Sequence, residues 1–150
     1  MWREHKVQCG KPIEEGVEVD KTIEQYKLDA EKGDAVAQYN VGVYYFSGVA
    51  SNMPKAFQWF TRSADAGNVE AMRHLGLCYE RGYGCTIDVN KAFKLYKHAA
   101  EEGDQIAQFT LGGCYMNATG VAHDMLEAAK WWKRAADSGL KEAQGCLDLM

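Results

Sequence analysis

The sequence repeats itself at an interval of 34 to 36 residues, and this period constrains the fold more than any local motif. The clearest copy runs from Asn68 to Gly103, and residues of the same types recur 36 positions further on. They also recur towards the N-terminus, where the interval falls from 36 to 34 because two residues are missing between Tyr45 and Gly48. Self-similarity with a period in the thirties is typical of proteins built from stacked repeats.

Each copy predicts a pair of short helices. In the first half of the clearest copy, Ala71, Leu75 and Tyr79 fall at i, i+4 and i+8, which places them in one apolar stripe of a helix. A glycine followed by Asp or Asn precedes the stripe, as at Gly67-Asn68, where glycine ends one helix and the polar side chain caps the next. The second helices are predicted over residues 54–66, 89–102 and 126–138, and they supply most of the aromatic bulk. The pattern therefore predicts an all-α chain.

Three glycines lie in register in the middle of the predicted first helices, at Gly42, Gly76 and Gly112. A glycine inside a helix costs about 1 kcal/mol relative to alanine. Their shared register predicts that a neighbouring helix approaches closely at each of them.

The repeat boundaries divide the chain as follows. Residues 1–19 are expected to form an irregular lead-in, and Asp20 is the expected N-cap of a half repeat over 20–33. Full repeats are predicted over 34–67, 68–103 and 104–139, and a C-terminal half repeat over 140–150. The junction Gly139-Leu140 lacks a capping residue, and Asp148 stands at the glycine position of the other first helices, which suggests a terminal cap. A longer solenoid truncated at Met150 remains the alternative.

Composition limits the classes of partner. The net charge of −4 and the lack of a dense Lys/Arg run argue against nucleic acid. The N-terminus is too polar for a signal peptide, and no apolar run approaches the roughly 18 residues of a membrane span. The odd count of five cysteines favours a reducing compartment. We therefore expect a cytoplasmic protein with no membrane contact, or a periplasmic or secreted one if a signal sequence has been removed.

The repeat resembles the Sel-one-like repeat, a relative of the tetratricopeptide repeat. The pattern of that family is A-x-x-x-L-G-x-x-Y-x-x-G-x-G-V-x-x-D-x-x-K-A-x-x-W-Y-x-K-A-A-x-x-G. Residues 68–103 meet it almost throughout, with Cys85 for the valine and Leu95-Tyr96 for the Trp-Tyr pair, while Ala118 replaces the first loop glycine in the next copy. The resemblance implies a right-handed α-solenoid of about three and a half to four helix pairs, with the first helices lining a concave face. It also implies adaptor or scaffold work on protein partners.

The residues on one arc of the predicted first helices vary between copies. By analogy with related repeats, this arc should face the groove on the concave side. The predicted partner-binding residues are Tyr39, Val43 and Phe46 in the first copy, Glu70, Arg73, Leu77, Glu80 and Arg81 in the second, and Ile106, Phe109, Met116 and Asn117 in the third. Their apolar content suits an extended or helical peptide with apolar anchors, and the two arginines suit a carboxylate. The alternative is that some of these aromatic side chains pack inside a tightly curved superhelix.

No metal or cofactor is predicted. Cys78 and Cys114 share a repeat position beside the apolar stripe, where a small buried and reduced cysteine is expected. The chain contains no C-x-x-C motif, and its four histidines occupy unrelated repeat positions.

We expect a non-catalytic protein, and a monomer. Ser138 and Lys141 match the S-x-x-K spacing of penicillin-recognising enzymes, but no S-D-N or K-T-G motif accompanies them. A β-lactamase-like enzyme, as described for some cysteine-rich relatives, is thus an alternative that nitrocefin turnover would test. Another is a structural solenoid that self-associates through its half repeats, which sedimentation at two concentrations would test.

Overall fold

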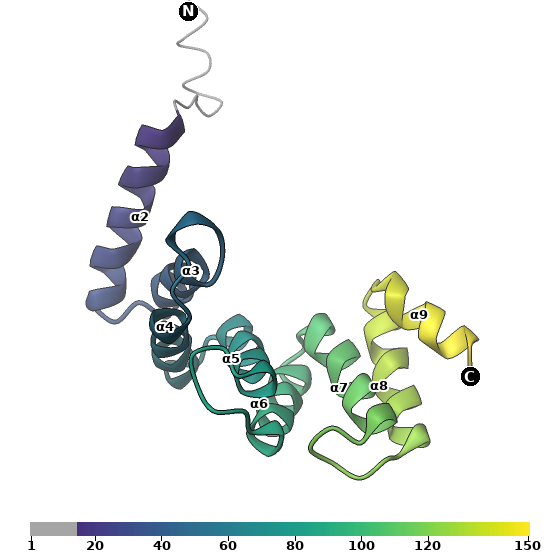
Figure 1. The fold of residues 1–150 in the computed structure, drawn as a ribbon. Coiled ribbons are helices and arrows are strands. Elements are labelled where there is room, and N and C mark those ends of the chain that lie inside the picture. Colours follow the sequence, from purple (N-terminus) through teal and green to yellow (C-terminus); the bar gives the residue numbers. More distant parts are fainter. Residues whose placement is uncertain (1–14) are drawn as a thin grey trace, which may run out of the picture.

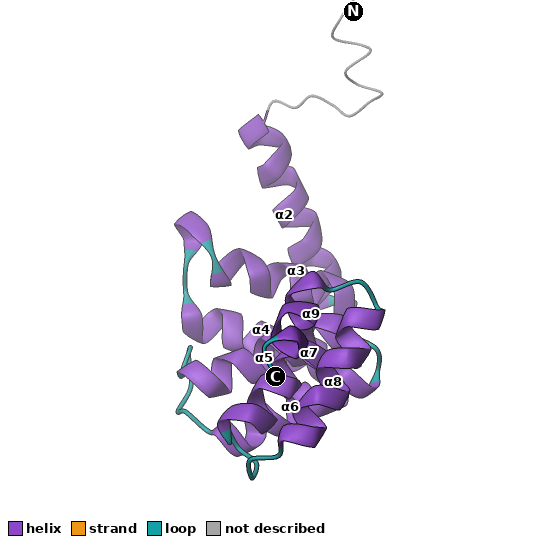
Figure 2. Ribbon diagram, turned by 90° about the vertical axis from the view of Figure 1, so that its right-hand side faces the viewer, coloured by secondary structure: helices purple, strands orange, loops and turns teal. Residues whose placement is uncertain are grey.

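The computed structural model describes residues 15–150, and over this range it contains helices and loops but no strand (Figure 2). Figure 1 shows the helices following one another as an elongated array, with α2 and α9 at opposite ends. The elements are α2 (Glu15–Glu31), α3 (Ala35–Phe46), η1 (Gly48–Ala50), α4 (Met53–Asp65), α5 (Val69–Arg81), α6 (Val89–Glu101), α7 (Gln105–Asn117), α8 (Met125–Asp137) and α9 (Lys141–Asp148). The predicted all-α solenoid is confirmed.

The main packing contacts join helices that are adjacent in sequence, from α2 with α3 to α8 with α9. The pairs α3–α4, α5–α6 and α7–α8 occupy the residues of the three predicted full repeats. α2 and α9 each supply half of a further pair. Packing of this near-neighbour kind is what makes a solenoid quasi-one-dimensional.

The first helix starts earlier than predicted. α2 begins at Glu15, so Asp20 lies inside the helix and the predicted cap at this residue is wrong. The sequence has no proline between Pro12 and Asp20, and a helix can therefore extend across these residues without losing a backbone hydrogen bond. Residues 1–14 of the predicted lead-in lie outside the described part of the chain.

The predicted corners between repeats are present. Three side chains cap the first helices by accepting backbone N–H groups, namely Asp34 from Ala37, Asn68 from Ala71 and Asp104 from Ala107, at 3.0, 2.7 and 2.9 Å. The glycine before each cap has a φ between +96° and +104°, a conformation that favours glycine. Leu140 makes no side-chain cap for α9, as its sequence predicts.

The mid-helix glycines meet aromatic rings of the second helix in the same repeat. A Cβ atom at Gly42, Gly76 or Gly112 would lie 2.6, 2.8 or 2.5 Å from the ring of Phe60, Tyr96 or Trp132, respectively. These rings are nearly or fully buried, with exposed fractions of 0%, 2% and 7%. The predicted close approach is therefore confirmed, and it is an aromatic side chain that approaches.

One loop position carries backbone strain. Ala118 ends α7 with a φ of 58°, where the preceding repeat has Gly82 with a φ of 77°. We expect Ala118→Gly to raise the free energy of unfolding by about 0.5–1 kcal/mol, because the left-handed conformation costs about 1–2 kcal/mol for an L-residue and the added chain entropy of glycine offsets part of that. Urea denaturation would measure the change.

Ala122 provides a matched control in the same loop, because its φ is not positive. Ala122→Gly should lower the free energy of unfolding by up to about 1 kcal/mol. Equal effects of the two substitutions would show that the conformation of Ala118 stores no strain.

Candidate functional site

Two adjoining cavities lie between the first helices of the second and third repeats. The first has a volume of about 260 Å³ and is lined by Arg73, His74 and Leu77 of α5 and by Ile106 of α7, among others. The second, of about 230 Å³, is lined mainly by α7 and includes Gly113. Glu80 and Thr110 line both cavities, so the two lie side by side. We call these two cavities together the α5–α7 groove.

Two aliphatic side chains in the groove do not contribute to the packed core. Leu77 is half-buried, and Ile106 is 44% exposed. Both line the first cavity, yet neither belongs to the hydrophobic clusters that hold the helices together. They therefore offer apolar surface to a ligand without serving the fold.

Arg73 connects three first helices. Its Nε donates to Oδ2 of Asp104 at 3.1 Å, and this carboxylate also caps α7. The side chains of Arg73 and Asp104 are only 18% and 9% exposed. Burial raises the pKa of Tyr39 on α3, and the nearby Arg73 opposes that rise. Because Arg73 is already paired, it is poorly placed to receive a carboxylate from a partner.

Glu80 lies at the junction of the two cavities. Its Oε1 accepts a hydrogen bond from the hydroxyl of buried Tyr96 at 2.7 Å. Burial, followed by this contact with Glu80, raises the pKa of Tyr96 far above its usual value, so the phenol keeps its proton. Arg81 approaches from the side of the first cavity, with its Nε 3.7 Å from Oε2 of Glu80.

Several predicted site residues pack against the protein's own core and do not line the groove. Tyr39, Val43 and Phe46 are half-buried against the main core cluster. The rings of Tyr39 and Phe46 lie 6.0 and 5.8 Å from that of Phe60, and each also contacts His74. The packing of Tyr39 and Phe46 agrees with the alternative sequence interpretation, in which some of these aromatic side chains pack inside the superhelix.

The predicted site residues of the third repeat include some that pack against the core and some that line the groove. Phe109 and Met116 pack against the C-terminal cluster, although Phe109 also lines the second cavity. Asn117 is exposed and lines this cavity. In the second repeat, Glu70 is exposed on α5 and lines neither cavity. The structure thus brings Arg73, Leu77, Glu80, Arg81, Ile106, Phe109 and Asn117 together, and it places Tyr39, Val43, Phe46, Glu70 and Met116 outside this set.

Sequence reasoning missed His74 and Thr110, which share a repeat position. His74 lies four residues after Glu70 and three before Leu77, so a helical wheel places it on the predicted face. Its Nδ1 lies 3.0 Å from the backbone oxygen of Glu70. Burial among aromatic rings lowers its pKa, which keeps the imidazole neutral near pH 7.

Within residues 15–150, neither the cysteines nor the S-x-x-K residues form a cluster of reactive side chains. Cys78 and Cys114 are free and buried, and burial raises the pKa of both thiols to about 12. Ser138 and Lys141 are exposed on either side of the corner between α8 and α9. Among the described residues, no group of three or more His, Cys, Asp or Glu side chains is placed to hold a metal. No helix within residues 15–150 is long and apolar enough to cross a membrane.

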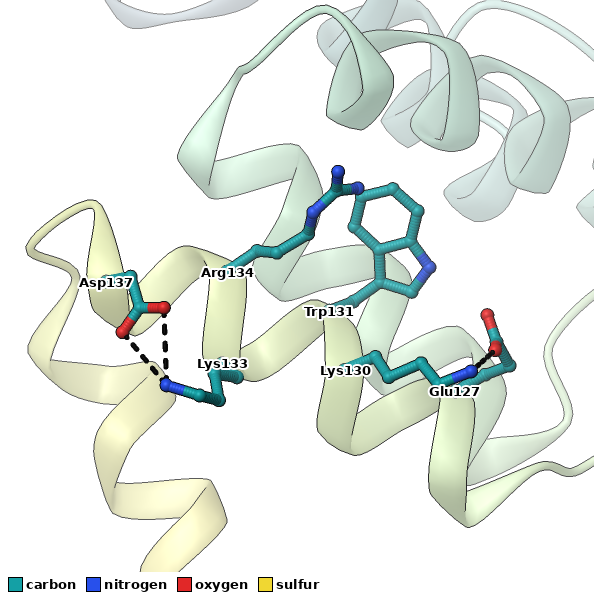
Figure 3. A pocket seen from close by; sticks show the side chains of 6 residues that line it. All are labelled: Glu127, Lys130, Trp131, Lys133, Arg134 and Asp137. Atoms are coloured by element: carbon teal, nitrogen blue, oxygen red, sulfur yellow. Dashed lines mark hydrogen bonds and ion pairs between the residues drawn. The ribbon is translucent and has the colours of Figure 1, made fainter.

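A larger hollow lies on the outer surface of α8 (Figure 3). All six lining residues come from this one helix. Lys130 and Lys133 bind their own neighbours Glu127 and Asp137, and the guanidinium of Arg134 lies 4.6 Å from the ring centre of Trp131. Both lysines are paired within the helix, and all the described residues that line this hollow belong to α8, so we consider it an ordinary charged surface.

The three repeats identify the protein family of this chain. A family model described as the Sel1 repeat matches residues 35–68, 69–104 and 105–140. This chain belongs to the Sel1 repeat family. The Sel-one-like resemblance of the sequence is thereby confirmed.

Solved structures of Sel1 repeat proteins agree with the fold. A Sel1 repeat protein from Oxalobacter formigenes is 31% identical, with a TM-score of 0.77, and the match covers 87% of this chain and 99% of that one. The protective antigen c5321 of uropathogenic Escherichia coli is 38% identical, also with a TM-score of 0.77, over 81% of this chain and 27% of that one.

The curated relatives are longer proteins. An F-box protein of Arabidopsis thaliana is 38% identical over 65 residues, which are 43% of this chain and 18% of the relative. The ERAD-associated E3 ubiquitin-protein ligase component HRD3A of the same plant is 34% identical over 70 residues, 45% of this chain and 10% of the relative. The chain therefore spans less than a fifth of the length of these relatives.

Proposed function

We propose that this chain is a non-catalytic adaptor that binds a segment of another protein in the α5–α7 groove. The observation that carries the proposal is the pairing of Leu77 and Ile106, two aliphatic side chains that line one cavity and lie outside every packed cluster of the described residues. Apolar side chains in a pocket between rigid helices are suited to anchor a partner's side chain.

The family supports the same class of function. The relative HRD3A is named as a component of a ubiquitin-protein ligase, which is a protein assembly. Repeat solenoids present extended surfaces for other polypeptides because each unit adds one helix to a continuous row. We place the adaptor in the cytoplasm and expect it to be a monomer, with the same sedimentation coefficient at low and high concentration.

Affinity capture from a lysate of the source organism tests this function. We expect the double variant Leu77→Ser/Ile106→Ser to lose most of the proteins that the unmodified chain retains, because the apolar anchors of the groove are gone. Its unfolding midpoint should change little, since neither side chain supports the core.

A matched control removes two exposed leucines outside the groove. Leu126 and Leu149 are 75% and 89% exposed. The variant Leu126→Ser/Leu149→Ser should retain the same proteins as the unmodified chain. If both double variants capture the same set, binding does not depend on the α5–α7 groove and the proposal is wrong.

A further inference from the structure

We propose that the segment bound in the α5–α7 groove carries a basic side chain, Lys or Arg, next to an aliphatic one, and that the carboxylate of Glu80 binds the basic group. This inference rests on the proposed function and specifies the chemistry of the partner.

Glu80 differs in kind from its repeat equivalents. The same position is Phe46 in the first repeat and Met116 in the third, and both of these pack against apolar clusters. In the second repeat it is a carboxylate with a side chain that is 28% exposed and that lines both cavities. An acidic group therefore stands in the groove where the repeat pattern otherwise places an apolar one.

The carboxylate keeps hydrogen-bonding capacity for a ligand. A carboxylate accepts about four hydrogen bonds, and Tyr96 supplies one at 2.7 Å. The Nε of Arg81 is 3.7 Å from Oε2, well beyond the roughly 2.7–2.9 Å of a charge-assisted hydrogen bond. The side chain of Arg81 is also 59% exposed, so it competes only weakly with a partner's cation.

The second cavity selects for positive charge. Among the described residues, Glu80 is the only charged one that lines it, and the aromatic residues Phe109 and Trp132 form part of its wall. Gly113 leaves the cavity open, because a Cβ atom there would meet nothing within 4 Å. A carboxylate among uncharged groups favours a cation through charge attraction.

The first cavity determines the neighbouring side chain. Leu77 and Ile106 line it, and its Arg73 is held by Asp104 at 3.1 Å. An aliphatic side chain fits this surface, and the adjacent basic side chain then reaches Glu80. A carboxylate-bearing segment, the earlier expectation, would instead meet the negative charge of Glu80, and of the two arginines that line this cavity only Arg81 is not held by Asp104.

The test uses a phage-displayed library of random twelve-residue peptides, selected on the full chain. We expect the selected peptides to be enriched in Lys or Arg beside Leu, Ile or Met. Glu80→Gln keeps an acceptor for Tyr96 but removes the charge, and it should weaken binding of these peptides roughly ten- to hundredfold. Replacing the basic residue by norleucine or citrulline should weaken binding to the unmodified chain similarly. Added salt should weaken binding to the unmodified chain and have little effect on the variant.

Two glycine variants separate this inference from the proposed function. Gly113→Tyr fills the second cavity, and Gly145→Tyr places the same side chain on α9, at another helical glycine whose Cβ would meet nothing within 4 Å. Peptides that bind Gly113→Tyr and the unmodified chain equally, or a selection that yields no peptide, would contradict both proposals. Peptides that are lost only in Gly113→Tyr, but that lack a basic residue or bind Glu80→Gln unchanged, would overturn the role of Glu80 and leave the groove intact. In that case Glu80 serves only the hydroxyl of Tyr96.

Discussion

Replacing Gly112 by alanine is expected to lower the free energy of unfolding by about 1–3 kcal/mol, although alanine is the better helix former. The new Cβ would lie 2.5 Å from both Cδ1 and Nε1 of the Trp132 ring. This ring is only 7% exposed, and its Nε1 donates to the backbone oxygen of Phe109 at 3.0 Å. Moving the ring away would therefore disturb packing and weaken a hydrogen bond at the same time.

The next residue supplies the control for this substitution. Gly113 lies on the same helix, and a Cβ there meets nothing within 4 Å. Gly113→Ala should raise the free energy of unfolding by about 1 kcal/mol through helix propensity alone. Chemical denaturation of both variants measures the difference, and two stabilising substitutions would show that the Trp132 ring has room to move.

Removal of Asp104 is expected to have the other large effect. We expect Asp104→Ala to lower the free energy of unfolding by about 2–4 kcal/mol, because it removes a helix cap and leaves a mostly buried arginine without its partner. The cap is the 2.9 Å hydrogen bond from Ala107, and the ion pair is the 3.1 Å contact with Arg73. The cap is local to the start of α7, whereas the ion pair joins the second repeat to the third.

Two substitutions separate these contributions. Asp34→Ala removes the equivalent cap of α3, the 3.0 Å hydrogen bond from Ala37, and should cost about 1 kcal/mol. Asp104→Asn retains a capping oxygen and removes the charge, so it reports the ion pair with Arg73. If thermal and urea unfolding show Asp104→Ala to be no worse than Asp34→Ala, the ion pair contributes nothing to stability.

The fold was predictable because its determinants are local and repeated. The apolar stripe through Leu75, the capping Asn68 and the mid-helix Gly76 each recur at equivalent positions, so one copy supports the interpretation of the next. Periodicity could not show where α2 begins. At the N-terminal end, only residues 20–33 match the second helix of the other repeats. The five helical residues before Asp20 have no counterpart in those repeats.

The sequence predicted the candidate site only as a set of equivalent positions on successive first helices. A helical wheel places Tyr39 and Arg73 at one repeat position, but it cannot show that Tyr39 packs beside Phe60 while Arg73 reaches Asp104 on another repeat. Those outcomes depend on side-chain size and on the neighbouring repeat. The bond between Glu80 and Tyr96 escaped prediction for the same reason, because no other repeat has that pair of residues.

The near-neighbour packing of the helices has a consequence for how such a chain changes length. A duplicated unit of 36 residues, inserted between Gly103 and Asp104, would present each flanking helix with the kind of surface it already meets. Its first helix would join the existing row and lengthen the proposed binding surface by one helix. If the proposed surface binds a partner, gene duplication lengthens the segment it recognises in fixed increments, while the side chains on each new helix diverge independently of the core.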